Sequence, residues 1–235
     1  LDESIESFVN ATEIDPGFVD AHYNLGNTLK ELNRLDESVK SYERAIAIDP
    51  EFAQAHNNLG NVQKDLNQLD DALKSYERAV SIDPEFAQAY NNLGNVFKEL
   101  DVNNESISSY KKAIEIDPNF AEAYYNLGII NKKIRKFDFA VQDFKKAISL
   151  KQDFAEAYNN LGSTYNALGK SKKAIELYEK VLTLKPNYAE AYNNLGSALK
   201  DLRRSNEAAK CYEKAILIKP DYAEAYCNLG SIYND

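Results

Sequence analysis

The sequence predicts an all-α solenoid of antiparallel helix pairs, and three periodic features predict it. Prolines recur every 34 residues except at Gln152, which fills the missing position; they are Pro16, Pro50, Pro84, Pro118, Pro186 and Pro220. An Asn-Leu-Gly triplet has the same interval, with glycines at Gly26, Gly60, Gly94, Gly128, Gly162, Gly196 and Gly230. Apolar residues within each period follow helical spacing. A constant period of this length indicates stacked structural repeats.

The first helix of each pair is expected to begin near an Asp-Pro pair such as Asp49-Pro50. Asp can accept hydrogen bonds from the free N–H groups of a helix start, and Pro is preorganised for the first helical position. Ala55, Leu59 and Val62 then lie on one face, in an i, i+4, i+7 pattern. Lysine replaces the Asp in two later repeats, which predicts a weaker cap there, at Lys185 and Lys219.

The second helix follows a short polar turn such as Asn67-Gln68. Its apolar positions in that repeat are Ala72, Tyr76 and Ala79. Gly and Ala at facing positions would let the two helices approach closely, and the aromatic rings would fill the space between neighbouring pairs. Each pair then packs only on its neighbours, so that the solenoid has no single core.

The period divides the chain into one continuous array without linkers or separate domains. Residues 1–18 form a half repeat with a second-type helix, and residues 223–235 form a half repeat with a first-type helix. Between them lie six complete repeats, at 19–52, 53–86, 87–120, 121–154, 155–188 and 189–222.

The pattern of large aromatic, Leu-Gly, small residue, aromatic, Ala and Pro resembles the tetratricopeptide repeat family along the whole chain. In one repeat these residues are His56, Leu59-Gly60, Ala72, Tyr76, Ala79 and Pro84. The resemblance implies a right-handed superhelix whose first helices line a concave inner surface, and a role in holding another protein. One subgroup of the family clamps a C-terminal carboxylate with a lysine at the fifth position of the first helix. Tyr, Asn and Cys occupy that position here, which disfavours the clamp.

Composition excludes several function classes. The net charge of −9 argues against nucleic acid as the partner, because phosphate binding needs a basic face. Residues 1–120 carry 10 basic and 23 acidic side chains, and residues 121–235 carry 18 and 14, so an acidic front precedes a mildly basic back. No apolar run is long enough for a membrane span. The sequence has only two cysteines and no signal segment, which predicts a cytoplasmic, reducing location. It does not begin with Met, which predicts a piece of a longer protein.

An asparagine column is the strongest functional signal. The same position of all seven first helices holds Asn24, Asn58, Asn92, Asn126, Asn160, Asn194 and Asn228. Asn in a helix interior costs roughly half a kcal/mol relative to Ala, so seven of them need a reason. An amide side chain offers an acceptor and two donors, which match a peptide unit. The column therefore predicts a ladder that binds an extended peptide through its backbone. Two alternatives are inheritance from recent duplication, and hydrogen bonds between neighbouring helices.

Two further rows flank the column and extend the candidate site. The first consists of Asn27, Asn61 and Asn95, continues as Ser163, Ser197 and Ser231, and is interrupted by Ile129. The second consists of Lys30, Lys64 and Lys98 and continues at Lys132 and Lys200. These lysines could attract an acidic segment. The alternative is a solvated helix face on which they neighbour Glu31, Asp65, Glu99 and Asp201.

The column is similar to that of the superhelical repeat region of O-linked N-acetylglucosamine transferases, where equivalent asparagines hold the backbone of protein substrates. The string "AYNNLGNVFKEL" at 89–100 carries the likeness. The chain has no room for a transferase domain. It could be the substrate-recruiting arm of such an enzyme, and this is the alternative to a freestanding scaffold.

No residue set predicts catalysis, a cofactor or a metal. His22 and His56 occupy a position that is Tyr in later repeats, and they fit packing. Gly169-Lys170-Ser171 lacks the earlier glycine of a phosphate-binding loop and fits a turn. Cys211 and Cys227 have no second ligand pair for zinc.

The two ends of the chain complement each other. A second-type helix opens it and a first-type helix closes it, so two copies placed end to end would rebuild a repeat. This predicts head-to-tail self-association through Leu1, Ile5 and Phe8 of one copy and Tyr226, Leu229 and Tyr233 of another.

Overall fold

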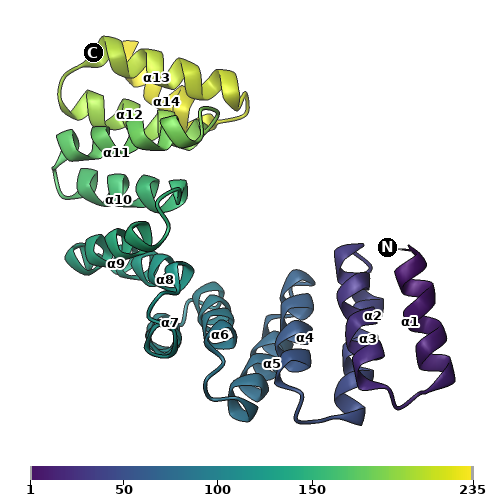
Figure 1. Cartoon of the computed structure of the whole chain (residues 1–235). Coiled ribbons are helices and arrows are strands. Elements are labelled where there is room, and N and C mark those ends of the chain that lie inside the picture. Colours follow the sequence, from purple (N-terminus) through teal and green to yellow (C-terminus); the bar gives the residue numbers. More distant parts are fainter. Residues whose placement is uncertain (1, 234–235) are drawn as a thin grey trace. The chain divides into compact units, whose positions relative to one another are not determined.

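The computed structural model describes residues 2–233, and in that part of the chain it consists of helices without a strand (Figure 1). Contacts cluster into two compact units, Leu1–Pro118 and Asn119–Asp235. The first unit contains α1 (Asp2–Ile14), α2 (Val19–Glu31), α3 (Leu35–Ile48), α4 (Ala53–Asp65), α5 (Leu69–Ile82), α6 (Ala87–Glu99) and α7 (Asn103–Ile116). The second contains α8 (Ala121–Lys133), α9 (Phe137–Leu150), α10 (Ala155–Ala167), α11 (Ser171–Leu184), α12 (Ala189–Asp201), α13 (Ser205–Ile218) and α14 (Ala223–Tyr233).

Helix pairs are the building block of both units. Within each unit, every helix packs on the next one in sequence. The first helices of successive pairs also contact one another, α2 with α4 and α4 with α6 in one unit, and α8 with α10 and α10 with α12 in the other. This confirms the predicted α-solenoid architecture within each unit. The handedness of the superhelix and the exact repeat boundaries stay predictions.

The turn inside each pair bends through one residue in the left-handed region of backbone space. That residue is Asn or Asp in the first unit, with φ of 58° at Asn33, 60° at Asn67 and 62° at Asp101. In the second unit it is Arg135, Gly169 or Arg203, with φ of 61°, 69° and 59°. Gly, Asn and Asp adopt this conformation most readily, whereas an arginine there is strained.

The first helices begin near Asp-Pro as expected, but the predicted roles of Asp as the cap and of Pro as the first helical residue are wrong. The first helices begin three residues after the proline, as α4 does at Ala53, and no side chain caps that start. Asp49 instead follows the last residue of α3, and its Oδ1 accepts a hydrogen bond from the N–H of Glu51 at 3.0 Å. Asp83 accepts from Glu85 in the same way, also at 3.0 Å. Short polar side chains often bond two residues ahead in turns, so the motif shapes the connection between pairs.

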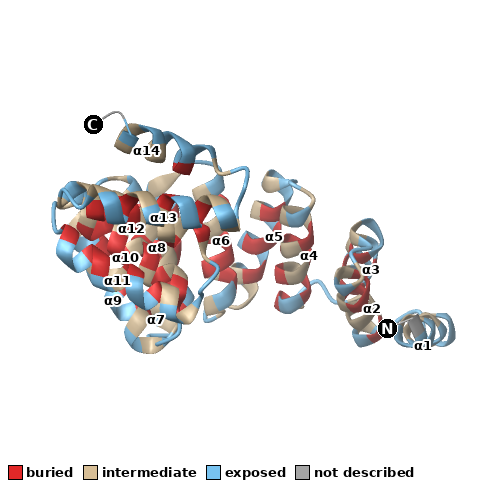
Figure 2. Cartoon of the chain, turned by 90° about the horizontal axis from the view of Figure 1, so that it is seen from above, coloured by how far each residue is buried: buried red, intermediate tan, exposed pale blue. Residues whose placement is uncertain are grey.

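The core of each pair is an aromatic ring of the second helix packed on a glycine of the first, a contact within the pair that the sequence did not predict. The rings also cluster with residues of the next pair, where the sequence placed them. Tyr76 and Tyr110 are fully buried, and so are the facing alanines such as Ala72 and Ala79. A methyl group added at Gly94 would lie 2.6 Å from the ring of Tyr110, closer than carbon atoms can approach. The glycines thus set how closely the two helices of a pair lie. In Figure 2 the buried residues follow the helix sides that face their neighbours.

One prediction compares two glycines at the same repeat position. Gly94→Ala must push the Tyr110 ring away and is expected to destabilise the chain by about 1–3 kcal/mol, as overpacked cores do. Gly230 has nothing within 4 Å of its added methyl, so Gly230→Ala should be neutral or stabilise α14 by up to about 1 kcal/mol. Thermal unfolding at low protein concentration measures both. Equal destabilisation by the two changes would contradict the role given to the ring.

Candidate functional site

The asparagine column, defined as the seven residues named above, holds neighbouring first helices together. In five of its members the side-chain N–H donates to the residue that precedes the column asparagine of the previous repeat. The Nδ2 distances are 2.9 Å from Asn58 to Tyr23 Oη, 3.0 Å from Asn92 to Asn57 Oδ1, 3.2 Å from Asn160 to Tyr125 Oη, 3.1 Å from Asn194 to Asn159 Oδ1, and 2.9 Å from Asn228 to Asn193 Oδ1. Bonding between neighbouring helices, one of the alternatives open from sequence, therefore occurs.

Two column amides of the first unit use both N–H groups internally. Asn58 Nδ2 also donates to Asn27 Oδ1 at 3.0 Å, and Asn92 Nδ2 to Asn61 Oδ1 at 3.2 Å. Asn92 is only 8% exposed, and its Oδ1 accepts from Gln88. An incoming peptide carbonyl would therefore have to displace an internal bond at these two asparagines.

The row of Asn27, Asn61 and Asn95 satisfies the hydroxyls of the buried tyrosines. The Oη of Tyr42, Tyr76 and Tyr110 donates to these three Oδ1 atoms in order, at 2.7, 2.8 and 2.8 Å. Burial raises the pKa of all three tyrosines, so each hydroxyl keeps the proton that it donates. The row thus links the second helix of one repeat to the column asparagine of the next.

The interruption at Ile129 has a matching change in the core. The second helix of that repeat carries Phe144 where the other complete repeats have Tyr, so no hydroxyl there needs an acceptor. Phe144 is fully buried, and a methyl group at Gly128 would lie 2.7 Å from its ring. In the last complete repeat a serine replaces the asparagine, and Tyr212 Oη donates to Ser197 Oγ at 3.3 Å.

The second unit leaves more of its column open. Asn194 and Asn228 are half-buried, and each uses one side-chain N–H. Within the described residues, their Oδ1 atoms and second N–H groups form no other hydrogen bond. Asn160 differs, since its Nδ2 also donates to the carbonyl of Glu156 and its Oδ1 accepts from Lys132 Nζ at 3.2 Å. Asn24 and Asn126 lie at the equivalent positions of α2 and α8 and are half-buried.

The lysine row lies beside the column and is partly tied to it. Lys30 Nζ is 3.8 Å from Asp65, and Lys98 Nζ donates to Asn95 Oδ1 at 3.3 Å. Burial lowers the pKa of both Lys98 and Lys132. Lys64 is half-buried on the same face of α4. The ion pair of Lys30 supports the interpretation of this row as a face on which charges balance locally.

The histidines and cysteines do not form a site. His22 Nε2 lies 3.2 Å from the carbonyl of Pro16, and His56 Nε2 lies 3.1 Å from that of Pro50, so both brace the turn before their helix. Burial raises the pKa of Cys211 to about 11, which keeps that thiol protonated. Among the described residues no group of His, Cys, Asp and Glu could hold a metal ion.

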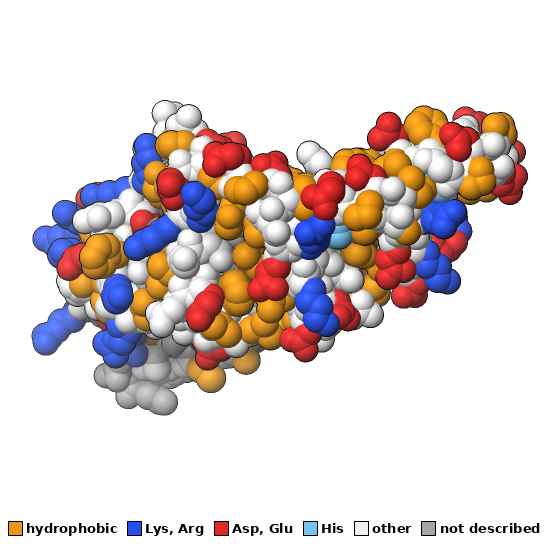
Figure 3. All heavy atoms as spheres, turned by 90° about the horizontal axis from the view of Figure 1, so that it is seen from below, with side chains coloured by type: hydrophobic (Ala, Val, Ile, Leu, Met, Phe, Trp, Pro, Cys, Tyr) orange, Lys and Arg blue, Asp and Glu red, His pale blue; other side chains and the backbone are white. Residues whose placement is uncertain are grey.

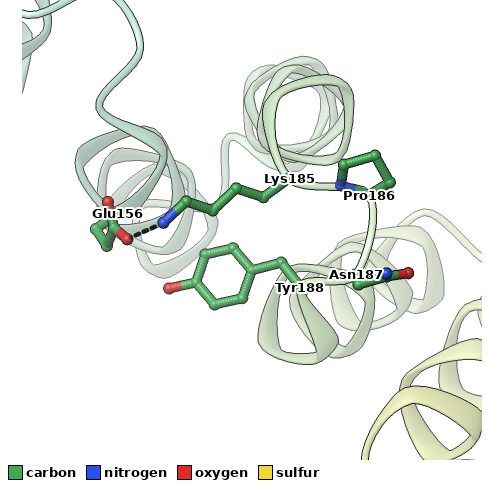
Figure 4. A pocket seen from close by; sticks show the side chains of 5 residues that line it. All are labelled: Glu156, Lys185, Pro186, Asn187 and Tyr188. Atoms are coloured by element: carbon green, nitrogen blue, oxygen red, sulfur yellow. Dashed lines mark hydrogen bonds and ion pairs between the residues drawn. The ribbon is translucent and has the colours of Figure 1, made fainter.

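A pocket at the junction of two pairs was not foreseen from the sequence (Figure 4). It has a volume of about 340 Å³ and is lined by Glu156 of α10 and by Lys185, Pro186, Asn187 and Tyr188, which connect α11 to α12. Lys185 forms an ion pair with Glu156, and its Nζ lies 5.9 Å from the centre of the Tyr188 ring. Lys151, Glu122 and Phe154 repeat the arrangement one period earlier. Two features of the sequence signal this arrangement. Lys replaces the Asp at the end of the repeat, and Glu stands at the second position of the first helix in the same repeat.

Sequence reasoning also missed the residues that accept from the column. Each directly precedes a column asparagine, and all are of two hydrogen-bonding types, Tyr or Asn: Tyr23, Asn57, Tyr125, Asn159 and Asn193. That restriction in residue type was the available signal. No helix among the described residues is long and apolar enough to cross a membrane.

This fold, and a face of asparagines that repeats with the helix pairs, define a repeat protein of the helical-hairpin class. Family models described as "TPR repeat" match residues 1–32, 26–67, 64–101 and 103–134, and models described as "Tetratricopeptide repeat" match 121–154, 155–188 and 189–222. The chain belongs to the tetratricopeptide repeat family.

Solved structures of the same kind are numerous. A crystal structure of MamA is 32% identical over 71% of this chain and 97% of its own, with a TM-score of 0.64. YrrB, described as "a TPR protein with an unusual peptide-binding site", is 25% identical over 80% of this chain and 97% of its own, with a TM-score of 0.67. PilW, a type IV pilus biogenesis factor, shares the fold with a TM-score of 0.81 at 22% identity, over 90% of this chain and 98% of its own. No curated protein sequence matches the chain.

A second prediction tests the link between the tyrosines and the row beside the column. Phe144→Tyr adds a buried hydroxyl opposite Ile129 and should destabilise the chain by about 1–3 kcal/mol, the usual result of an unpaired buried polar group. Ile129→Asn in the same chain supplies the acceptor and should recover most of that loss. Thermal unfolding of both single variants and the double variant gives the coupling. Additive effects would contradict the proposed pairing.

Proposed function

We propose that this tetratricopeptide repeat protein is an interaction scaffold, and that it binds an extended segment of another protein along its asparagine column. The observation that carries the proposal is the open hydrogen-bonding capacity of Asn194 and Asn228 in the second unit. Each retains one N–H and its Oδ1, which match the carbonyl and the N–H of a peptide backbone. The likeness to YrrB, whose description names a peptide-binding site, favours the same use of the fold.

The two units would contribute differently to such binding. At Asn58 and Asn92 both N–H groups donate within the chain and Oδ1 accepts there as well, so a peptide would have to displace internal hydrogen bonds in the first unit. In the second unit each open asparagine could accept and donate. Backbone contacts of this kind discriminate little among side chains, which suits a scaffold that takes several partners.

The experiment that tests this proposal starts from peptides selected on the intact chain by random-peptide display. Their affinities are then measured by fluorescence anisotropy for the wild type and for the Asn194→Ala/Asn228→Ala variant. The double variant removes at least two hydrogen bonds to the peptide, of about 1 kcal/mol each, so binding should weaken at least about 30-fold. Methylation of the peptide N–H groups should weaken it as well, whereas exchange of peptide side chains should matter less.

The matched control is Asn206→Ala, which removes the same side chain from an exposed position of the second helix α13. It should bind like the wild type. Peptides that bind the column variant and the wild type equally well, or a selection that yields no binder, would overturn the proposal. Thermal unfolding of each variant shows that the helices remain folded.

Self-association is a second candidate, and the empty space at Gly230 favours it. In the six complete repeats, a methyl at the equivalent glycine would meet a ring of the next helix at 2.6–2.8 Å, whereas Gly230 meets nothing. Tyr226 and Tyr233 of α14 are 51% and 68% exposed, and Leu229 is half-buried. In α1 of another copy, Phe8 stands at the repeat position of the missing ring, with Ile5 beside it. Leu1, also expected at this contact, lies outside the described residues.

Sedimentation velocity over a range of protein concentrations tests this contact for the 235-residue chain. The wild type should form larger species as concentration rises, and Gly230→Ala should suppress them, because its methyl would strike the incoming Phe8 ring. Ser205→Ala, a change of similar size on α13, is the control and should assemble like the wild type. A wild type that stays monomeric at millimolar concentration would rule the contact out.

A further inference from the structure

Four lysines at the beginning of α11 and on the neighbouring α9 form no ion pair within the described part of the chain. They are Lys145, Lys170, Lys172 and Lys173, and all four are exposed. Three of their ammonium groups converge on one ring, because the Nζ atoms of Lys145, Lys170 and Lys173 lie 5.9, 6.0 and 5.6 Å from the centre of Tyr165. Attraction to the ring offsets only part of the repulsion among like charges, since such contacts are weak at exposed sites. This cluster is named the α11 lysine cluster here.

Acidic side chains that balance the other second helices are missing from α11. Each other second helix of a complete pair has an acid in its first turn, such as Glu37 in α3 and Glu207 in α13. The first turn of α11 has none and carries Lys172 and Lys173 instead. The start of a helix attracts negative charge. The start of α11 therefore favours an acidic group, and its own first turn supplies none.

A pocket lies beside three of the four lysines, those at the beginning of α11. Its volume is about 340 Å³, and Gly169, Lys170, Ser171, Lys172, Lys173 and Leu202 line it. Gly169 leaves the entrance open, because nothing lies within 4 Å of a methyl group placed on it. In Figure 3 the side chains of the second unit, on the left, include many Lys and Arg, drawn in blue. The pocket has room for a single small anionic group.

An acidic side chain beside Ser171, one of the residues that line the pocket, is already engaged. Asp201 accepts a hydrogen bond from Asn166 Nδ2 at 2.9 Å and lies 3.5 Å from Ser171 Oγ. It forms no ion pair with any of the four lysines in the described structure. None of the described ion pairs brings another acidic side chain to the four lysines. The positive charge of the cluster therefore stays uncompensated.

We propose that the α11 lysine cluster binds a phosphate monoester group, carried by a phosphorylated protein segment or present as free phosphate. A phosphate dianion would gain from three ammonium groups, which provide charge-assisted hydrogen bonds, and from the N–H groups at the helix start. The cluster belongs to second helices and their turns, whereas the asparagine column belongs to first helices. The proposal therefore stands independently of peptide binding by the column.

The test uses the intact chain labelled with ¹⁵N and titrated with three probes. These are inorganic phosphate, a phosphoserine peptide, and the same peptide with unmodified serine. Saturable shifts of the backbone amides of residues 170–174 are expected for the first two probes and not for the third. A phosphopeptide that binds at least tenfold more tightly than inorganic phosphate identifies a protein as the source, and equal affinities identify the free ion.

Two charge-reversed variants of equal net charge decide whether the cluster is responsible. Lys172→Asp/Lys173→Glu gives α11 the acidic first turn that α3 has at Asp36 and Glu37, so it should fold. It is expected to lower phosphate affinity at least tenfold. Lys210→Glu/Lys214→Glu, on the exposed face of α13, should leave affinity unchanged. Equal losses in both variants, or a wild type without saturable shifts up to 10 mM of either phosphate probe, would overturn the proposal.

Discussion

The contact between an aromatic ring and a glycine is the constraint on which each repeat depends. A second helix can approach its partner this closely only where no side chain intervenes, and the ring of a residue such as Tyr110 fills the space that Gly94 leaves. Burial of a tyrosine then imposes a second condition, since its hydroxyl needs an acceptor inside the helix pair. Asn95 provides that acceptor. Polar residues on the face of the first helices thus follow directly from the packing of the core.

This dependence changes the interpretation of the asparagine face. A residue such as Asn27 accepts from the tyrosine of its own repeat and from Asn58 of the next one, so it connects core packing to the alignment of neighbouring pairs. In the proposed binding mode, a peptide would meet the same amides. Internal hydrogen bonds and peptide binding would then compete for the donors at Asn58 and Asn92, and less so at Asn194 and Asn228. The two units share a fold and differ in what their surface leaves available.

The charge difference between the units also has a local structural basis. Before the repeat prolines, the first unit has aspartates such as Asp49, which shape a turn by bonding to the backbone. Lys185 occupies that position in the second unit, where it pairs with Glu156 and packs near Tyr188. In the first unit the Asp carboxylate stabilises this turn by accepting a backbone hydrogen bond. In the second unit the Lys side chain at the same position instead forms an ion pair with the preceding first helix. The α11 lysine cluster adds positive charge that no such pairing balances.

The sequence by itself determined the repeat length, the helix pairs, the buried faces and the family, because each of these depends on the period of residue types along the chain. It also determined which residues form the column. Only the tertiary structure decided where the amides of that column point, since Asn58 meets Tyr23 35 residues earlier, and no local rule predicts such a pairing. The same holds for the helix start at Ala53, which depends on how the turn after Asp49 bonds. Ile129 and Phe144 can both be read from the sequence. Only the packing of the two helices shows that Phe144 has no hydroxyl and therefore needs no acceptor at position 129.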